Sequence, residues 1–230
     1  AVRQLNISIR GERAEFNGCY LAKLIAQFPA EAQVSFFGHS FGTRVVSAAL
    51  QVMAGGSLPS CDFRYQPKEL RSYRAVFAAA AIDRNWLNPG QRYGRAMTVI
   101  DWLLNLKNGA DIVINLYPLR GWFARQALGR VGFSPSDRLR MGSLASRIYE
   151  WDVTMGIGAG HAWSFYYSRP DIGRVIAPYL VFAKLPPHQI TATPTQIAPV
   201  VSTPVPQTAK PTPPRVLRDS IRIPQKTVTR

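Results

Sequence analysis

Apolar residues recur at helical spacing in several separate segments of the chain. In each segment they fall three or four positions apart, which places them on one face of a helix. Pro29 ends the first segment and Gly55-Gly56 closes the second, as expected of helix ends. The predicted helices cover residues 21–28, 43–53, 91–107 and 172–180.

Short, continuous apolar runs lie between these helical segments. Such runs are typical of strands buried on both faces, because helices on either side of a parallel sheet cover both sets of side chains. Strands that alternate with helices predict an α/β fold with a mostly parallel sheet flanked by helices. The four runs, in chain order, are residues 34–37, 75–82, 111–117 and 148–153.

The composition changes sharply after Leu185. Residues 186–230 are rich in Pro and Thr and contain too little apolar material to form a core. We therefore expect one domain over residues 1–185 and a basic, disordered tail over residues 186–230.

The pentapeptide Gly38-His39-Ser40-Phe41-Gly42 follows the first strand run and precedes a predicted helix. A serine on a sharp strand-to-helix turn projects its hydroxyl above the sheet, as a nucleophile requires. Glycine at both ends of the motif avoids Cβ atoms where strand and helix approach. The backbone N–H of Phe41, at the start of the helix, is placed to donate to a developing oxyanion.

A serine nucleophile needs a base, and the chain contains three histidines. His39 neighbours the nucleophile and is expected to point away from its Oγ, and His188 lies in the predicted tail. His161 follows the last strand run and a glycine-rich segment. We therefore predict His161 as the general base.

The acid of the triad must reach the sheet edge that carries Ser40. Asp83 directly follows the second strand run at that edge and is the predicted acid, although a capping or loop role stays open. Asp111 opens the third run, so it is expected at the opposite edge of the sheet, about 20 Å from the edge that carries Ser40. Asp152 ends the fourth run, lies close to His161 in sequence and is the alternative acid.

The elbow motif, the helix that begins Thr43-Arg44-Val45-Val46 and a late His161 resemble the α/β-hydrolase superfamily, closest to bacterial lipases and esterases. The resemblance covers about residues 17–185 and implies a Ser-His-Asp triad, an acyl-enzyme and an ester or lipid-like substrate, with neither cofactor nor metal. Most members carry the acid after the strand that here corresponds to residues 111–117, where the chain has Arg120-Gly121-Trp122. Some lipases carry it one strand earlier, as Asp83 is. Phe36, Phe37, Phe41, Trp163 and Phe165 are candidates for an apolar acyl pocket, or alternatively for the core.

Only 39 residues precede Ser40, which leaves room for at most one strand before the elbow. The first strands of the hydrolase fold, and the loop that gives the second oxyanion donor, are therefore expected to be missing. An alternative hypothesis follows: a truncated or inactive hydrolase fold that serves as an interaction module.

The net charge is +15, of which residues 186–230 contribute +5. A basic surface attracts anionic partners, so weak contact with anionic surfaces is a further hypothesis. The arginines are scattered without a nucleic-acid motif, and no specific nucleic-acid binding is expected.

Two cysteines, Cys19 and Cys61, do not make a disulfide framework in a chain of this length, and two free thiols are predicted. No membrane-spanning run or secretory signal is evident. The compartment stays open with the cytoplasm favoured, and the oligomeric state stays open too.

Overall fold

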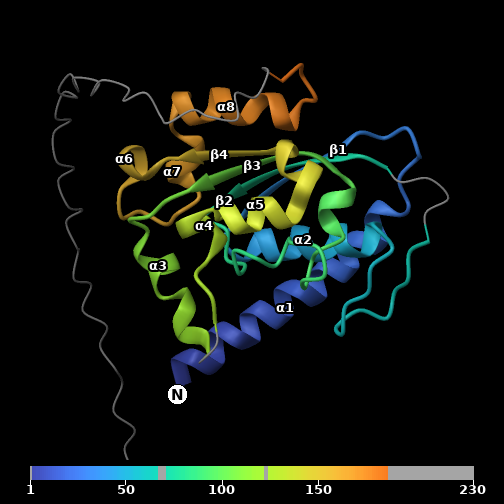
Figure 1. Ribbon diagram of the computed structural model, residues 1–230, viewed down its shortest axis with the longest axis horizontal. Helices are drawn as coiled ribbons and strands as arrows, with labels where there is room; N and C mark the ends of the chain where they lie inside the picture. The colour runs from blue at the N-terminus through green and yellow to red at the C-terminus, as the bar shows by residue number, and fades with distance from the viewer. Residues whose placement is uncertain (1, 67–70, 122–123, 186–230) are drawn as a thin grey trace, which may run out of the picture. The chain divides into compact units, whose positions relative to one another are not determined.

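A parallel β-sheet forms the centre of the described part of the chain. The computed structural model describes residues 2–66, 71–121 and 124–185 (Figure 1), so the predicted tail at 186–230 lies outside the described residues. Within these ranges the strands lie side by side in chain order, which confirms the prediction of a parallel α/β arrangement. They are β1 (Val34–His39), β2 (Tyr73–Ala78), β3 (Ile100–Lys107) and β4 (Ile148–Asp152).

The carboxyl ends of all these strands reach the same edge of the sheet. The pairing aligns His39 of β1 with Ala78 of β2, Ala78 with Leu106 of β3, and Leu106 with Trp151 of β4. Side chains on the segments that leave these strands therefore meet at one edge, where parallel sheets commonly place their ligands.

Both faces of the sheet are covered. Successive residues of a strand point to opposite faces, so Ala75 and Phe77 of β2 join one core cluster while Val76 and Ala78 join the other. All four side chains are fully buried. This double burial explains why β2 appears in the sequence as a continuous apolar run.

Figure 1 shows helices on both sides of the sheet. Helix α2 (Phe41–Met53) packs on one face, with α1 (Val2–Ile25) lying across it, and α8 (Pro170–Leu180) packs on the other face. None of the helices in the described ranges is long and apolar enough to cross a membrane. The shorter elements are η1 (Ala96–Thr98), α3 (Ile112–Asn115), η2 (Tyr117–Arg120), α4 (Leu128–Val131), α5 (Pro135–Met141), η3 (Gly142–Arg147), α6 (Thr154–Ile157) and α7 (Ser164–Tyr167).

The predicted helix over residues 91–107 is wrong, because its second half is strand β3. Leu103 and Leu104 face opposite sides of the sheet and are both fully buried. The strand therefore lacks the alternation of apolar and polar residues that marks a half-buried strand, and its apolar residues also fit a helical pattern. Asn105 is buried within the strand and donates to Glu150 Oε1 on β4 at 3.0 Å. A buried polar residue, bonded to the neighbouring strand through its Nδ2, thus obscured the strand pattern.

The predicted strand over residues 111–117 is also wrong, since this segment forms α3 and then η2. The Asp111 carboxylate accepts hydrogen bonds from the backbone N–H groups of Val113 and Ile114, and so caps α3. Ile112 and Val113 are more than half exposed. Capping therefore overrode the β-favouring composition of this apolar run.

A buried carboxylate ties α1 to the elbow helix α2. Glu15 of α1 is almost fully buried and accepts hydrogen bonds from Ser60, Arg92 and Tyr93. It also pairs with Arg44 of α2 at 3.6 Å. Burial opposes ionisation, but the bonds from Arg92 and Tyr93 outweigh it and lower the pKa of Glu15.

Cys19 of α1 and Cys61 form a disulfide, with their Cα atoms 5.5 Å apart. The prediction of two free thiols is therefore wrong, because the proximity of these residues depends on how the segment after α2 folds back on α1. Disulfides persist in oxidising compartments and are rare in the cytosol, and the cytoplasmic location stays a prediction.

Replacing both cysteines with serine is expected to reduce the free energy of unfolding by about 4 kcal/mol, since the disulfide closes a loop with a sequence separation of 42. Urea unfolding followed by circular dichroism measures this difference. A reductant should shift the midpoint of the wild-type protein and leave that of the double variant unchanged. Equal midpoints for the two proteins without reductant would contradict the expectation.

Candidate active site

Ser40 occupies a strained turn between β1 and α2. Its backbone has φ 53° and ψ −124°, a conformation that residues other than glycine rarely adopt. Backbone hydrogen bonds hold the turn: Ser40 N–H donates to the Ala78 carbonyl at 3.0 Å, and the Ser40 carbonyl accepts from Thr43 and Ala81. Strain of this kind, maintained by surrounding contacts, is characteristic of functional sites.

The two glycines of the elbow motif have different reasons to be there. A Cβ on Gly38 would lie 2.9 Å from Thr43 Cα and 3.0 Å from its nitrogen, closer than packing allows. A Cβ on Gly42 would meet no atom within 4 Å. The expected steric role is therefore present at Gly38, and the same expectation for Gly42 is wrong.

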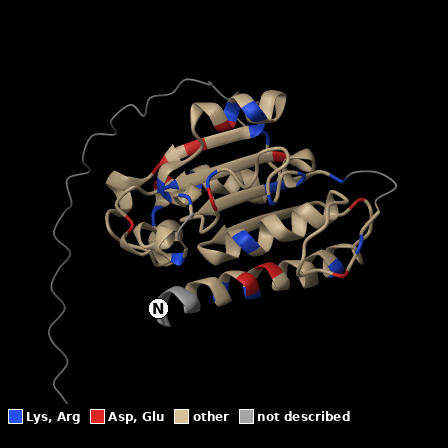
Figure 2. Cartoon of the chain, turned by 60° about the horizontal axis from the view of Figure 1, so that its bottom comes forward, with Lys and Arg blue, Asp and Glu red and all other residues tan. Residues whose placement is uncertain are grey.

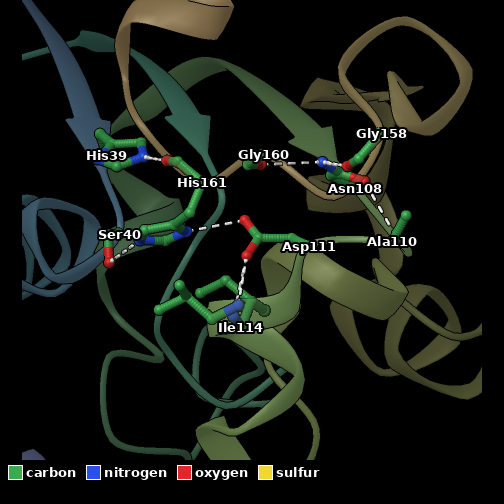
Figure 3. A network of polar contacts seen from close by, with 10 residues as sticks. His39, Ser40, Asn108, Ala110, Asp111, Ile114, Gly158, Gly160 and His161 are labelled. Atoms are coloured by element: carbon green, nitrogen blue, oxygen red, sulfur yellow. Dashed lines mark hydrogen bonds and ion pairs between the residues drawn. The ribbon is translucent and has the colours of Figure 1, made fainter.

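The imidazole of His161 lies beside the Ser40 hydroxyl (Figure 3). Its Nε2 is 3.1 Å from Ser40 Oγ, within hydrogen-bond distance. Serine at the start of a helix usually caps it with its side chain, but Ser40 makes no such bond to α2. The hydroxyl is therefore directed to His161, as predicted for these two residues.

The carboxylate beside His161 belongs to Asp111. Its Oδ2 lies 2.8 Å from His161 Nδ1, and its Oδ1 accepts from the N–H groups of Val113 and Ile114 at 2.9 and 3.0 Å (Figure 3). The Asp111 side chain is completely buried. A carboxylate can only accept here, so Nδ1 carries the proton and Nε2 is left to accept the Ser40 O–H.

Asp83, the predicted acid, is engaged elsewhere. It follows β2 at the expected edge, but its Oδ1 pairs with Arg120. Burial raises the pKa of Asp83, while Arg120 acts in the opposite direction. The prediction misplaced the acid because β3, not the run at 111–117, is the third strand. Asp111 therefore follows a strand end and lies at the edge that carries Ser40.

Asp152, the alternative acid, is also directed away from His161. Its carboxylate pairs with Lys107 at 3.2 Å and accepts from the Thr154 N–H at 3.0 Å. Although burial opposes ionisation, these hydrogen bonds lower the pKa of Asp152. Its role in the structure is to join the ends of β3 and β4.

The Phe41 N–H lies immediately after Ser40 and is the first of helix α2. The first N–H groups of a helix have no partner within the helix, and among the described residues none accepts from Phe41. Together with the positive end of the helix dipole, this group provides one donor for an anion that forms at Ser40.

His39 points away from Ser40 Oγ, as predicted. Its Nε2 lies 2.6 Å from the backbone carbonyl oxygen of His161. Since a carbonyl can only accept, this nitrogen carries the proton and donates. Burial lowers the pKa of His39, which favours the neutral ring.

The aromatic residues proposed for an acyl pocket have different positions. Phe36 is buried in the core, and Phe37 and Phe41 are partly buried against the second core cluster. Trp163 and Phe165, just after His161, are about half exposed. Sequence reasoning missed further exposed apolar residues just after Asp111; these are Ile112, Val113, Leu116 and Leu119.

A pocket of about 580 Å³ lies beside the disulfide, between α1 and residues 58–64. Phe16, Tyr20 and Arg64 contribute to its lining, but none of the residues around Ser40 does. We therefore assign it no part in the chemistry of Ser40.

Comparisons of the chain with protein-family models, curated proteins and solved structures found no match. In the part of the chain that the structure describes, no group of three or more His, Cys, Asp or Glu side chains could hold a metal ion. Function is therefore inferred from the geometry around Ser40.

Asp111→Asn is expected to lower kcat for the ester substrates that the α/β-hydrolase resemblance implies by about 10⁴-fold, because the amide would favour the wrong tautomer of His161. Asp83→Asn is the matched control: it removes a carboxylate from Arg120 and should leave kcat per folded molecule within about threefold of wild type. Steady-state kinetics at equal folded concentration compares the two. A severe loss in D83N with normal turnover in D111N would show that the acid is Asp83 after all.

Proposed function

We propose that the protein is a serine hydrolase that cleaves carboxylic esters through Ser40, His161 and Asp111. The observation that carries the proposal is the continuous alignment of these three side chains, with the hydroxyl on a strained strand-to-helix turn. Nucleophile, base and orienting acid in hydrogen-bond contact are the defining geometry of this chemistry.

The reaction proceeds in two halves. Ser40 Oγ attacks the substrate carbonyl carbon while its proton passes to His161 Nε2, and Asp111 stabilises the resulting imidazolium. The Phe41 N–H donates to the oxyanion of the tetrahedral intermediate. His161 then protonates the leaving alcohol, which departs and leaves an acyl group on Ser40. In the second half, water loses a proton to His161 and attacks the acyl carbonyl carbon. The bond to Ser40 Oγ then breaks, His161 returns the proton to that oxygen, and the carboxylic acid is released.

The exposed apolar residues favour a substrate with an apolar acyl group. Those on α3 and η2 come directly after Asp111, and those around α7 come directly after His161. The Ile112 N–H reaches the Ala159 carbonyl at 3.5 Å, so the two segments adjoin. Contiguous exposed apolar residues commonly mark binding surfaces, and these residues belong to the adjoining segments that carry the acid and the base.

The position of Asp111 also supports the resemblance to α/β-hydrolases. Most members carry the acid after the strand that here is β3, and Asp111 follows β3 after a short turn. The interaction-module hypothesis was motivated both by the expected lack of a second oxyanion donor and by the lack of an acid there. Asp111 answers the second ground, and the first stays a prediction.

Binding to anionic surfaces stays a separate prediction. Figure 2 shows Lys and Arg spread over helices, strands and connecting segments of the described chain. Such a distribution gives general attraction to anions and no defined site.

Ser40→Ala is expected to reduce hydrolysis of short p-nitrophenyl esters by about 10⁴-fold or more, because the nucleophile of the acyl-enzyme step is lost. Ser146→Ala is the control, since Ser146 is exposed and its hydroxyl donates to the nearby Ser143 carbonyl. Absorbance of released p-nitrophenolate measures turnover. Activity of S40A equal to that of S146A would refute the proposed function.

A further inference from the structure

The segment that carries His161 has no regular secondary structure between α6 and α7. It includes Gly158 and Gly160, and flexible residues of this kind do not by themselves fix the position of a base. The precision that proton transfer from Ser40 requires must therefore come from contacts to neighbouring segments.

Asn108 makes such contacts from the side of the acid. Its side chain is completely buried, and its Nδ2 donates to the carbonyl oxygen of Gly158 at 2.8 Å, with that of Gly160 at 3.5 Å (Figure 3). Its Oδ1 accepts from the Ala110 N–H at 3.0 Å, directly before Asp111. One amide group thus joins the backbone that precedes the acid to the backbone that precedes the base.

The backbone of Asn108 extends this connection to the elbow. Its N–H donates to the Gly129 carbonyl at 2.7 Å, and the Gly129 N–H donates to the Ala80 carbonyl at 3.0 Å. Ala80 belongs to the segment after β2 in which Ala81 donates to the Ser40 carbonyl. Hydrogen bonds therefore link the segments of all three triad residues through Asn108.

We propose that Asn108 is a positioning residue that fixes the position of the His161 ring between Asp111 and Ser40. This role rests on the proposed hydrolase function. Asn108 touches none of the reacting atoms; it fixes the carbonyl groups of Gly158 and Gly160, while His39 holds the carbonyl of His161 from β1.

Asn108→Asp tests the proposal because it keeps the shape of the side chain but replaces the donor with an acceptor that faces two carbonyl oxygens. We expect kcat to fall about 10- to 100-fold with KM within about twofold of wild type, since a displacement of the base on the order of 1 Å has such an effect. Amide hydrogen exchange over residues 154–163 should also become faster.

Asn88→Asp is the matched control, because Asn88 is equally buried and its Nδ2 donates to Asp137. It should leave kcat per folded molecule and exchange over residues 154–163 unchanged. If N108D does not fold, Asn108→Ser provides the same comparison with a smaller side chain.

The background variant His161→Ala separates positioning from a general effect on the fold. In that background N108D should change the residual turnover less than twofold, because the residue that it positions is gone. Where turnover depends on Ser40, two results would overturn the positioning role. One is unchanged kcat in folded N108D, and the other is an equal fold-loss of kcat from N108D with and without His161. Turnover that does not depend on Ser40 would instead refute the proposed function and the positioning role with it.

Discussion

The positive φ of Ser40 is the constraint on which the rest of the site depends. A non-glycine residue held there costs on the order of 1–3 kcal/mol, and the hydrogen bonds to Ala78, Ala81 and Thr43 keep the turn closed. Gly38 lets α2 start close enough to β1 for those bonds to form. The strained turn directs the hydroxyl to His161 and leaves the Phe41 N–H beside it, so one backbone conformation supplies both the proposed nucleophile and the proposed oxyanion donor.

The parallel sheet brings the other two groups to that turn. Because the carboxyl ends of β1 to β4 share one edge, the segments after β3 and β4 can deliver Asp111 and His161 from strands far from the elbow in sequence. Local bonds then set the orientation of each side chain. The N-terminus of α3 holds one oxygen of Asp111 and leaves the other for His161, which fixes the imidazole tautomer. Asn108 and His39 make hydrogen bonds to the backbone around His161, the proposed base.

The elbow could be predicted because its signal is local: glycines flank a serine between a strand run and a helix run. His161 could be predicted as the base by elimination among the three histidines of the chain. Asp111 could not be predicted, because its apolar neighbours Ile112 to Ile114 favour a strand by composition, and only the cap formed by its own carboxylate turns them into a helix. Strand β3 was missed because burial on both faces and a bonded Asn105 removed its alternation. The Cys19–Cys61 contact depends on tertiary packing, for which the sequence carries no local signal.

The central claim is that Ser40 is an activated nucleophile, and covalent labelling tests it most directly. The folded wild-type protein is treated with a fluorophosphonate and analysed by intact mass and peptide mapping. One adduct per chain on Ser40 is expected, with labelling strongly slowed in His161→Ala because the base no longer removes the hydroxyl proton. Folded wild-type protein that takes up no label, or that is labelled on a different serine, would contradict the claim.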